Sequence, residues 1–132
     1  MALNLYSYVV NPFTEDAFFD EKLFAKHAKL ANRFMDDIID LEEEKIKAII
    51  AKIESDPETD DIKSVEAKLW ENILEKCQQG RRTGIGITAM GDMLAAMGLR
   101  YGTPKATDFA EGVHKILAVN VYKGSVELAK DR

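Results

Sequence analysis

The sequence predicts a mainly α-helical domain that carries two short β-strands. Three long segments, residues 21–55, 62–80 and 104–132, have apolar side chains at helical spacing and recognisable start or stop residues. Strands are expected at residues 3–10, which are apolar on both faces, and at Thr83–Ile87, where isoleucines alternate with glycines. At 132 residues, of which 46% are hydrophobic, the chain is long enough for one domain, residues 1–132, with a buried core.

Charge and composition argue against several classes of function. The formal net charge of -5 disfavours a general binder of nucleic acid or of anionic membranes. Cys77 is the only cysteine, so the chain can form neither an internal disulfide nor a cysteine cluster for zinc. No apolar run approaches the ~20 residues of a membrane helix, and the first residues lack a signal-peptide pattern. We therefore expect a cytoplasmic location.

The first strand should end at Asn11-Pro12, because proline lacks the backbone donor and favours extended geometry in the residue before it. Asp20 is expected to cap the first long helix, which continues or restarts as far as Asp56-Pro57. His27 lies on the apolar stripe of this helix, where a packed core residue is favoured over a ligand.

An acidic run, residues 36–44, lies in the same helix. It lacks the glycine and the alternation of a calcium loop, and no histidine lies at ligand spacing. A solvated charged face is therefore favoured over a metal site.

The second long helix is expected to start at a cap, Thr59 or Asp60, and to end at Gly80. Gly80 suits the left-handed conformation of the residue that follows a helix. Cys77 falls on the apolar side of this helix, and no cationic helix end or nearby histidine that would favour a thiolate is evident. A buried, inert thiol is therefore favoured over a nucleophile.

A short helix over Asp92–Met97 should follow the glycine-rich strand. Thr103 and Pro104 form a cap and first-residue pair that opens the last long helix. Gly112 and Gly124 weaken this helix by up to ~1 kcal/mol each relative to alanine, which suggests close packing at both positions.

The glycine-rich stretch from Gly80 to Gly98 fits neither common phosphate motif. The spacing Gly84-x-Gly86-x-x-x-x-Gly91 differs from the dinucleotide fingerprint, and the Gly-Lys-Ser/Thr ending of a P-loop is absent. Arg81 and Arg82 could still bind a carboxylate or phosphate bidentately. The residues alone favour the alternative that they pair with acidic helices of the same domain. No catalytic triad, paired carboxylates or metal-ligand set is recognisable.

The stretch Gly80-Arg81-Arg82-Thr83-Gly84-Ile85-Gly86, followed by Gly91-Asp92-Met93-Leu94-Ala95, resembles the "GRR-x-G-[IL]-G" segment of the catalytic subunit of ribonucleotide reductases. Further likenesses follow the family's order along the chain. Asn4-Leu5 resembles the family's "N-L" strand, and residues 34–40 resemble its "R-x-x-D-x-x-[IL]-D" helix. Gly98–Gly102 resembles the segment that follows the glycine-rich one, and residues 125–130 resemble the helix end "S-x-x-L-A-K". The residues 6–13 and 42–79 look most like the adenosylcobalamin-dependent branch, and the diiron-partnered branch is the alternative.

The resemblance implies a piece of a ten-stranded α/β barrel that reduces ribonucleotides to deoxyribonucleotides with a thiyl radical. Leu5–Val10 and Thr83–Ile87 would be barrel strands, and the helices would pack outside. The redox-active and radical-bearing cysteines of the family fall outside residues 1–132, and Cys77 matches none of them. We therefore expect no catalytic residue, no metal and no cofactor on this piece, which would be inactive scaffold. Adenosylcobalamin would serve the parent enzyme, and the partners would be the rest of the barrel or a second copy.

A small helical interaction module is the competing interpretation. It would use Arg81, Arg82 and Arg100 to bind an acidic or phosphorylated partner. The residues leave open the class of reductase and the choice between diphosphate and triphosphate substrates.

Overall fold

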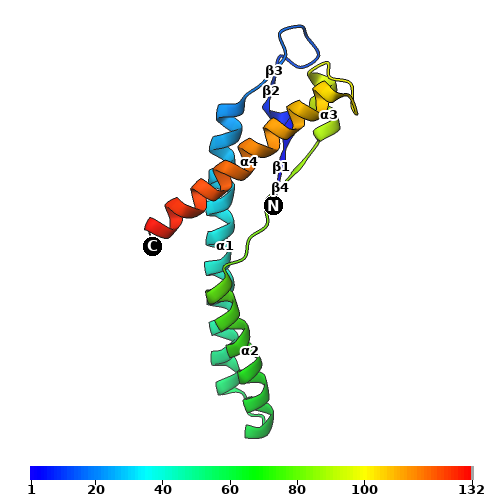
Figure 1. The fold of residues 1–132 in the computed structure, drawn as a ribbon. Helices are drawn as coiled ribbons and strands as arrows, with labels where there is room; N and C mark the ends of the chain where they lie inside the picture. Colours follow the sequence, from blue (N-terminus) through cyan, green and yellow to red (C-terminus); the bar gives the residue numbers. More distant parts are fainter. Residues whose placement is uncertain (132) are drawn as a thin grey trace. The chain divides into compact units, whose positions relative to one another are not determined.

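The computed structural model describes residues 1–131, and most of them are helical (Figure 1). The elements, in chain order, are β1 (Ala2–Asn4), the 3₁₀ helix η1 (Leu5–Tyr8), β2 (Val9–Val10), β3 (Phe18–Phe19), α1 (Glu21–Ser55), α2 (Asp60–Gly80), β4 (Gly86–Thr88), α3 (Met90–Ala96) and α4 (Pro104–Asp131). Contacts group the chain into two compact units: Met1–Arg33 with the chain from Gly84 onward, and Phe34–Thr83. The expectation of one domain over residues 1–132 stays a prediction. No helix of residues 1–131 combines the length and apolarity needed to cross a membrane.

The first unit contains two small sheets. β1 pairs with β4 in parallel, with Leu3 opposite Ile87, and β2 pairs with β3 in an antiparallel arrangement. The N–H of Gly86 also donates to the carbonyl of Met1 over 2.9 Å. Because parallel strands cannot be joined by a tight turn, β1 and β4 need a long crossover, and α1 and α2 occupy it in the sequence.

The prediction of one continuous strand over residues 3–10 is wrong. The chain leaves β1 after Asn4, makes the 3₁₀ turn η1 and returns to extended geometry at Val9. In a 3₁₀ helix, side chains three residues apart lie on the same face. Leu5 and Tyr8 are therefore both buried in the core, which an extended strand would place on opposite faces.

Aromatic side chains form the centre of the first unit's core. Phe24 of α1 is fully buried, and its ring lies 5.0 Å from that of Tyr8 and 5.3 Å from that of Phe19. The Tyr8 hydroxyl is 3.1 Å from Nδ1 of His27, and the two rings pack edge to face. Burial raises the pKa of Tyr8. The interpretation of His27 as a packed residue is confirmed.

The caps of the long helices follow the sequence. Oδ1 of Asp20 accepts from the N–H of Leu23 over 2.9 Å, and α1 is one unbroken helix from Glu21 to Ser55. Thr59 occupies the N-cap position of α2. Oγ1 of Thr103 accepts a long bond, 3.4 Å, from the N–H of Ala106 in the first turn of α4.

The glycine-rich segment becomes a strand later than predicted. β4 begins at Gly86 because its partner β1 is only three residues long, and the amino group of Met1 donates to the carbonyl of Gly84 over 2.8 Å. Ala89, with φ 60° and ψ 36°, then turns the chain, so that α3 starts at Met90 rather than at Asp92.

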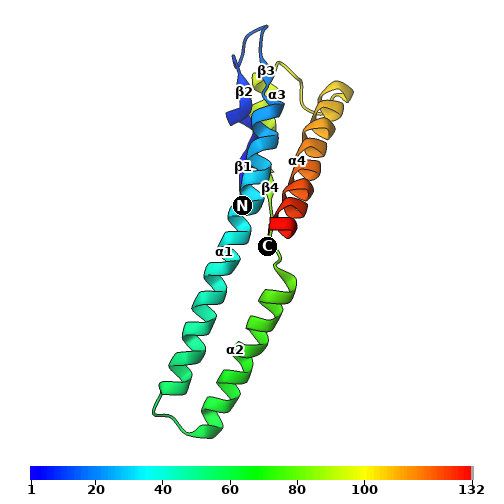
Figure 2. The same cartoon turned by 90° about the vertical axis from the view of Figure 1, so that its left-hand side faces the viewer.

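The second unit is an antiparallel pair of helices, formed by α2 and by α1 from Phe34 onward (Figure 2). Ile39, Ile46 and Ile53 of α1 are buried at intervals of seven residues. Every residue of Asp60–Gly80 keeps some exposure to solvent. The hairpin therefore buries one face of α1 more completely than any face of α2.

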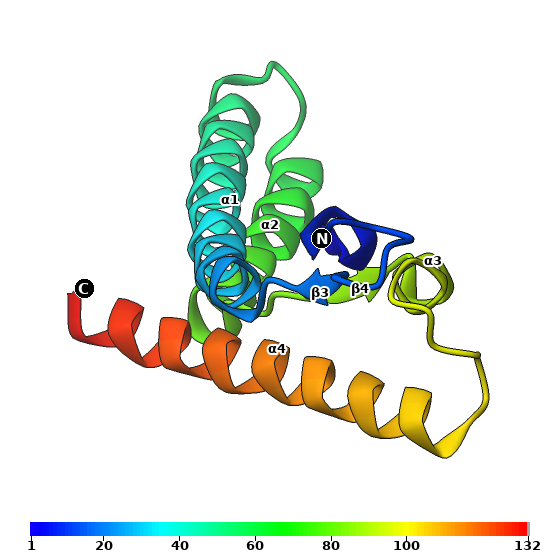
Figure 3. The same cartoon turned by 90° about the horizontal axis from the view of Figure 1, so that it is seen from above.

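The two glycines of α4 differ in their surroundings. α4 crosses the first turns of α1 at Gly124, where an added Cβ would lie 3.4 Å from Cα of Lys29 (Figure 3). At Gly112 an added Cβ would meet nothing within 4 Å. Close packing is thus confirmed at Gly124, and the same expectation at Gly112 is wrong.

Gly112→Ala is expected to raise the free energy of unfolding by about 0.5–1 kcal/mol, because alanine loses less conformational entropy in a helix and the space is open. Gly124→Val should instead lower it, because a branched side chain has to displace the backbone of α1 at Lys29. Urea unfolding followed by circular dichroism measures both. Equal effects of the two substitutions would contradict the different packing.

Candidate functional site

The end of α2 differs from the sequence prediction. Gly80 remains within the helix, and Arg81 is the residue that adopts the left-handed conformation, with φ 38° and ψ 49°. Its N–H donates to the carbonyl of Cys77 over 3.0 Å. A left-handed non-glycine residue costs roughly 1–2 kcal/mol, so other contacts must hold Arg81 in place.

The guanidinium of Arg81 supplies these contacts by binding three carboxylates of α1. Its Nε lies 2.8 Å from Oδ1 of Asp36, and its Nη2 lies 2.8 Å from Oδ1 of Asp40. Its Nη1 lies 3.4 Å from Oε1 of Glu43, and Nη2 also donates to the carbonyl of Asp36 over 3.0 Å. We call these four side chains the arginine clamp. It joins the end of α2 to α1 within the second unit.

The clamp is shielded from solvent on most sides. The side chains of Asp36 and Glu43 are 13% and 14% exposed, that of Arg81 is 29% exposed, and Asp40 is the most open of the four. The hydrogen bonds that Arg81 donates to Asp36 and then to Asp40 raise its pKa further, although burial opposes them. Arg81 is therefore a permanent cation, held by charge-assisted hydrogen bonds.

The acidic run is thus more than the solvated face that the sequence favoured. Asp36, Asp40 and Glu43 follow one another at intervals of four and three residues, which places them on one side of α1. This spacing alone predicts that the three carboxylates share one face of α1. Arg81 lies about forty positions away in sequence, and no local pattern identifies it as their partner. Residues 1–131 contain no group of three or more histidine, cysteine or acidic residues arranged to hold a metal ion.

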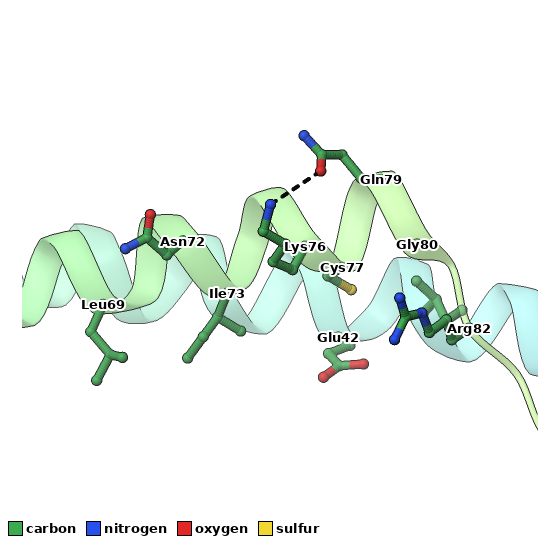
Figure 4. A pocket seen from close by; sticks show the side chains of 10 residues that line it. Glu42, Leu69, Asn72, Ile73, Lys76, Cys77, Gln79, Gly80 and Arg82 are labelled. Carbon is green, nitrogen blue, oxygen red and sulfur yellow. Dashed lines mark hydrogen bonds between the residues drawn. The ribbon is translucent and has the colours of Figure 1, made fainter.

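A groove of about 770 Å³ lies beside the clamp in the same unit (Figure 4). Leu69 and Ile73 project from one side of α2 into this groove, and Ile39 of α1 contributes to its lining. Lys76, Arg82 and the carboxylate of Glu42 also line it, and Nζ of Lys76 donates to Oε1 of Gln79 over 3.3 Å. The groove therefore combines an apolar part with charged side chains of both signs.

Cys77 also lines this groove and is half-buried. Burial raises the pKa of its thiol, the nearby carboxylates of Glu42 and Glu43 raise it further, and Arg81 lowers it. A raised pKa means less thiolate at neutral pH, and the thiolate is the nucleophilic form. The environment of Cys77 therefore agrees with the inert thiol that the sequence favours.

Cys77 is expected to react with iodoacetamide more slowly than an unperturbed cysteine at about pH 7.5. Glu42→Gln should speed the reaction, because removing a negative charge lowers the pKa of the thiol. Glu44→Gln, at an exposed position of the same acidic run, is the matched control. Equal rates for the two variants across pH would contradict the assigned electrostatic cause.

The two predicted anion-binding residues have different environments. Arg81 is engaged by the carboxylates of its own domain, which is the alternative that the residues alone favoured. Arg82 is exposed and lines the groove. Binding of an external anion by Arg81 or Arg82 stays a prediction. Lys76, which no sequence pattern singles out, also lines the groove.

Comparison with known proteins identifies the family. The family model of the ribonucleotide reductase barrel domain matches residues 2–132. The large subunit of ribonucleoside-diphosphate reductase from a Kenyan pig isolate of African swine fever virus is 35% identical over 52 residues. The same subunit from the Vero-adapted Badajoz strain is 33% identical over 52 residues. No solved structure matches the chain.

The matched segment covers 39% of this chain and 7% of each viral subunit. The chain thus corresponds to a small part of the length of these relatives. The family match, in contrast, extends over almost every residue and includes the glycine-rich segment, β1 and the clamp. The mainly helical structure with a few short strands fits part of a barrel, and residues 1–131 do not close one. The chain belongs to the ribonucleotide reductase family, within its barrel domain.

Proposed function

We propose that this chain is scaffold within a catalytic subunit that reduces ribonucleotides to deoxyribonucleotides by a thiyl radical, in the cytoplasm. The observation that carries the proposal is the family match over residues 2–132. The parallel pairing of β1 with β4 supports it, because an α/β barrel is built from parallel strands joined by helical crossovers. An added Cβ would meet nothing within 4 Å at Gly84 or Gly86, so this face of the segment is open to close packing by another part of the parent barrel.

We assign no catalytic step to the described residues. Cys77, the only cysteine, lies on a helix. Its raised pKa lowers the fraction of thiolate at neutral pH, so it is a poor nucleophile. The charged side chains of the arginine clamp form ion pairs with one another. The reaction would therefore require other parts of the parent enzyme, and the isolated chain would be inactive.

We further propose that the parent belongs to the adenosylcobalamin-dependent branch, as the likeness of residues 6–13 and 42–79 suggests. The described residues do not form a site for this cofactor. His27 is hydrogen-bonded to Tyr8 in the core, and Nδ1 of His114 lies 2.9 Å from the carbonyl of Ala110 within the exposed face of α4.

The parent enzyme provides the direct test. Supplied with adenosylcobalamin and a dithiol as the two-electron reductant, it should convert a ribonucleotide to the deoxyribonucleotide and water, and omission of the cofactor should abolish the product. Parallel assays with diphosphates and triphosphates would identify the substrate. Activity that requires a diiron subunit instead would overturn the branch assignment and leave the family membership intact.

The 132-residue chain provides the complementary test. Isothermal titration with adenosylcobalamin and with nucleoside diphosphates or triphosphates should give no saturable heat, while circular dichroism shows a helical, folded chain. Saturable binding would contradict the scaffold role. Arg82→Ala would then show whether the groove is responsible.

A helical interaction module for an acidic or phosphorylated partner is a second proposal. The observation that favours it is the presence of two basic side chains, Lys76 and Arg82, in the lining of a partly apolar groove. Arg81 is a weaker contributor, because an external anion would have to compete with the clamp carboxylates. Arg100 lies in the exposed loop before α4, in the other unit. Binding of a phosphorylated peptide that is lost in Lys76→Ala and Arg82→Ala would support the module.

A further inference from the structure

The sheet formed by β1 and β4 has two unlike faces. Leu3 of β1 and Ile87 of β4 are opposite each other and pack against the core, to which α1 contributes Phe24 and α4 contributes Val113. Successive side chains of a strand point to opposite faces, so the neighbours of Leu3 and Ile87 lie on the second face. This second face consists of small and polar residues: Ala2, Asn4, Gly86 and Thr88.

Asn4 and Thr88 lie side by side on the second face. They are partners in the parallel register, they form the carboxyl ends of β1 and β4, and both are exposed. An amide and a hydroxyl can each donate and accept a hydrogen bond. An added Cβ at Gly86, two residues before Thr88, would meet nothing within 4 Å. The second face therefore combines open space with a pair of uncharged hydrogen-bonding side chains.

The two faces have different places in a barrel. In an α/β barrel, one face of each strand packs against the surrounding helices and the other faces the interior. Leu3 and Ile87 pack against residues of two helices, so Asn4 and Thr88 would face the interior of the parent barrel proposed above. An interior that is filled by packing alone carries bulky branched side chains. Open space beside uncharged polar groups, at the carboxyl ends of parallel strands, is instead the arrangement in which α/β folds bind ligands.

The backbone directly after Thr88 is strained. Ala89 has φ 60° and ψ 36°, a left-handed conformation that is unfavourable for a residue with a Cβ. Such strain persists only where surrounding contacts hold it, and it is concentrated at functional sites. It turns the chain from β4 into α3, which leaves the side chain of Thr88 at the very end of the strand.

We propose that Asn4 and Thr88 bind ribose hydroxyl groups of the nucleotide substrate inside the parent barrel, an inference that rests on the proposed reductase function. The ribose presents two adjacent uncharged hydroxyls, each of which donates and accepts a hydrogen bond, and an amide beside a hydroxyl matches this pattern. The phosphates of a nucleotide favour cationic partners such as arginine, whereas all four residues of the second face are uncharged. The second face therefore suits the sugar better than the phosphates.

Kinetic assays of the parent enzyme, supplied with adenosylcobalamin and a dithiol, test the proposal. Thr88→Val removes the hydroxyl and keeps the branched shape, and Asn4→Ala removes the amide. Each should lower kcat/KM by about three- to tenfold, as expected for the loss of one hydrogen bond. The factor should be the same for all four ribonucleotides, because they share the ribose. Thr107→Val, which removes an exposed hydroxyl from α4, is the matched control and should leave kcat/KM unchanged.

Nucleotide affinity distinguishes a contact with the sugar from a purely structural role. For the wild-type enzyme, equilibrium dialysis with a ribonucleotide and with its 2′-deoxy and 3′-deoxy analogues shows how much each hydroxyl contributes to binding. In Thr88→Val and in Asn4→Ala, deleting the contacted hydroxyl should cost about three- to tenfold less affinity than in the wild type, because its partner is already absent. A change in structure alone would weaken the binding of all three nucleotides by the same factor.

Equal discrimination among the three nucleotides by the wild type and by both variants would overturn the proposal. An effect confined to one base, or an effect of Thr107→Val as large as that of Thr88→Val, would also overturn it. These outcomes leave the reductase function intact when the wild-type parent reduces ribonucleotides. A wild-type parent that reduces none refutes the reductase function, and this inference with it.

Discussion

Phe24→Ala is expected to lower the free energy of unfolding by about 3–5 kcal/mol, the range for removing a large aromatic side chain from a core. Phe24 is fully buried, and its ring packs against those of Tyr8 and Phe19. These partners come from η1 and β3, so one side chain of α1 holds two irregular N-terminal segments. Alanine would leave a cavity and also remove two edge-to-face contacts. Urea unfolding followed by circular dichroism measures the loss.

Phe34→Ala is the matched control for Phe24→Ala. Phe34 lies on the same helix and is 54% exposed, so its replacement removes the same atoms from a largely solvated position. Its effect should stay within about 1 kcal/mol. If Phe34→Ala destabilised the chain as much as Phe24→Ala, the core assigned to the first unit would be wrong.

The helices were predictable because their signals are local. Asp20, Thr59 and Thr103 occupy the cap positions, and the apolar spacing between caps and breakers defines α1, α2 and α4 closely. Each of these signals needs only neighbouring residues. Family membership was likewise predictable, because the glycine-rich segment and the flanking motifs occur in order along the chain.

The strands were less predictable because tertiary contacts decide them. Residues 3–10 have the composition of a buried strand, yet the chain gains more by burying Leu5 and Tyr8 together through the 3₁₀ turn. β4 begins at Gly86 rather than near Thr83, because a strand can extend only as far as its partner β1. β3 is two residues long and carries no periodic signal.

The arginine clamp could be predicted only in part. The acidic residues of α1 and the two arginines are evident in the sequence, and pairing within the domain was favoured for Arg81. The partner carboxylates were not predicted, because the contact depends on the hairpin that returns α2 alongside α1. The same contact explains why Arg81, and not Gly80, adopts the left-handed conformation: the ion pairs offset the strain that a glycine would avoid.

Arg81→Ala is expected to lower the free energy of unfolding by about 1–3 kcal/mol, which is the range for hydrogen bonds between charged groups. Solvent screening reduces the contribution of the ion pair with Asp40, which is the more exposed carboxylate. The substitution removes the cation shared by Asp36, Asp40 and Glu43, and their mutual repulsion then acts along one side of α1. The effect should shrink in about 1 M NaCl, because salt screens these charges. Urea unfolding at low and high salt measures both.

Arg81→Gly separates the clamp from the backbone strain. It removes the same ion pairs, but glycine adopts φ 38° without a steric penalty, so this variant should be more stable than Arg81→Ala by about 1 kcal/mol. Arg82→Ala, at an exposed neighbour that keeps the clamp, should change stability by no more than about 0.5 kcal/mol. If Arg82→Ala were as damaging as Arg81→Ala, general loss of positive charge would explain the effect better than the clamp. If glycine gained nothing over alanine, the left-handed strain at Arg81 would not be a cost that the clamp offsets.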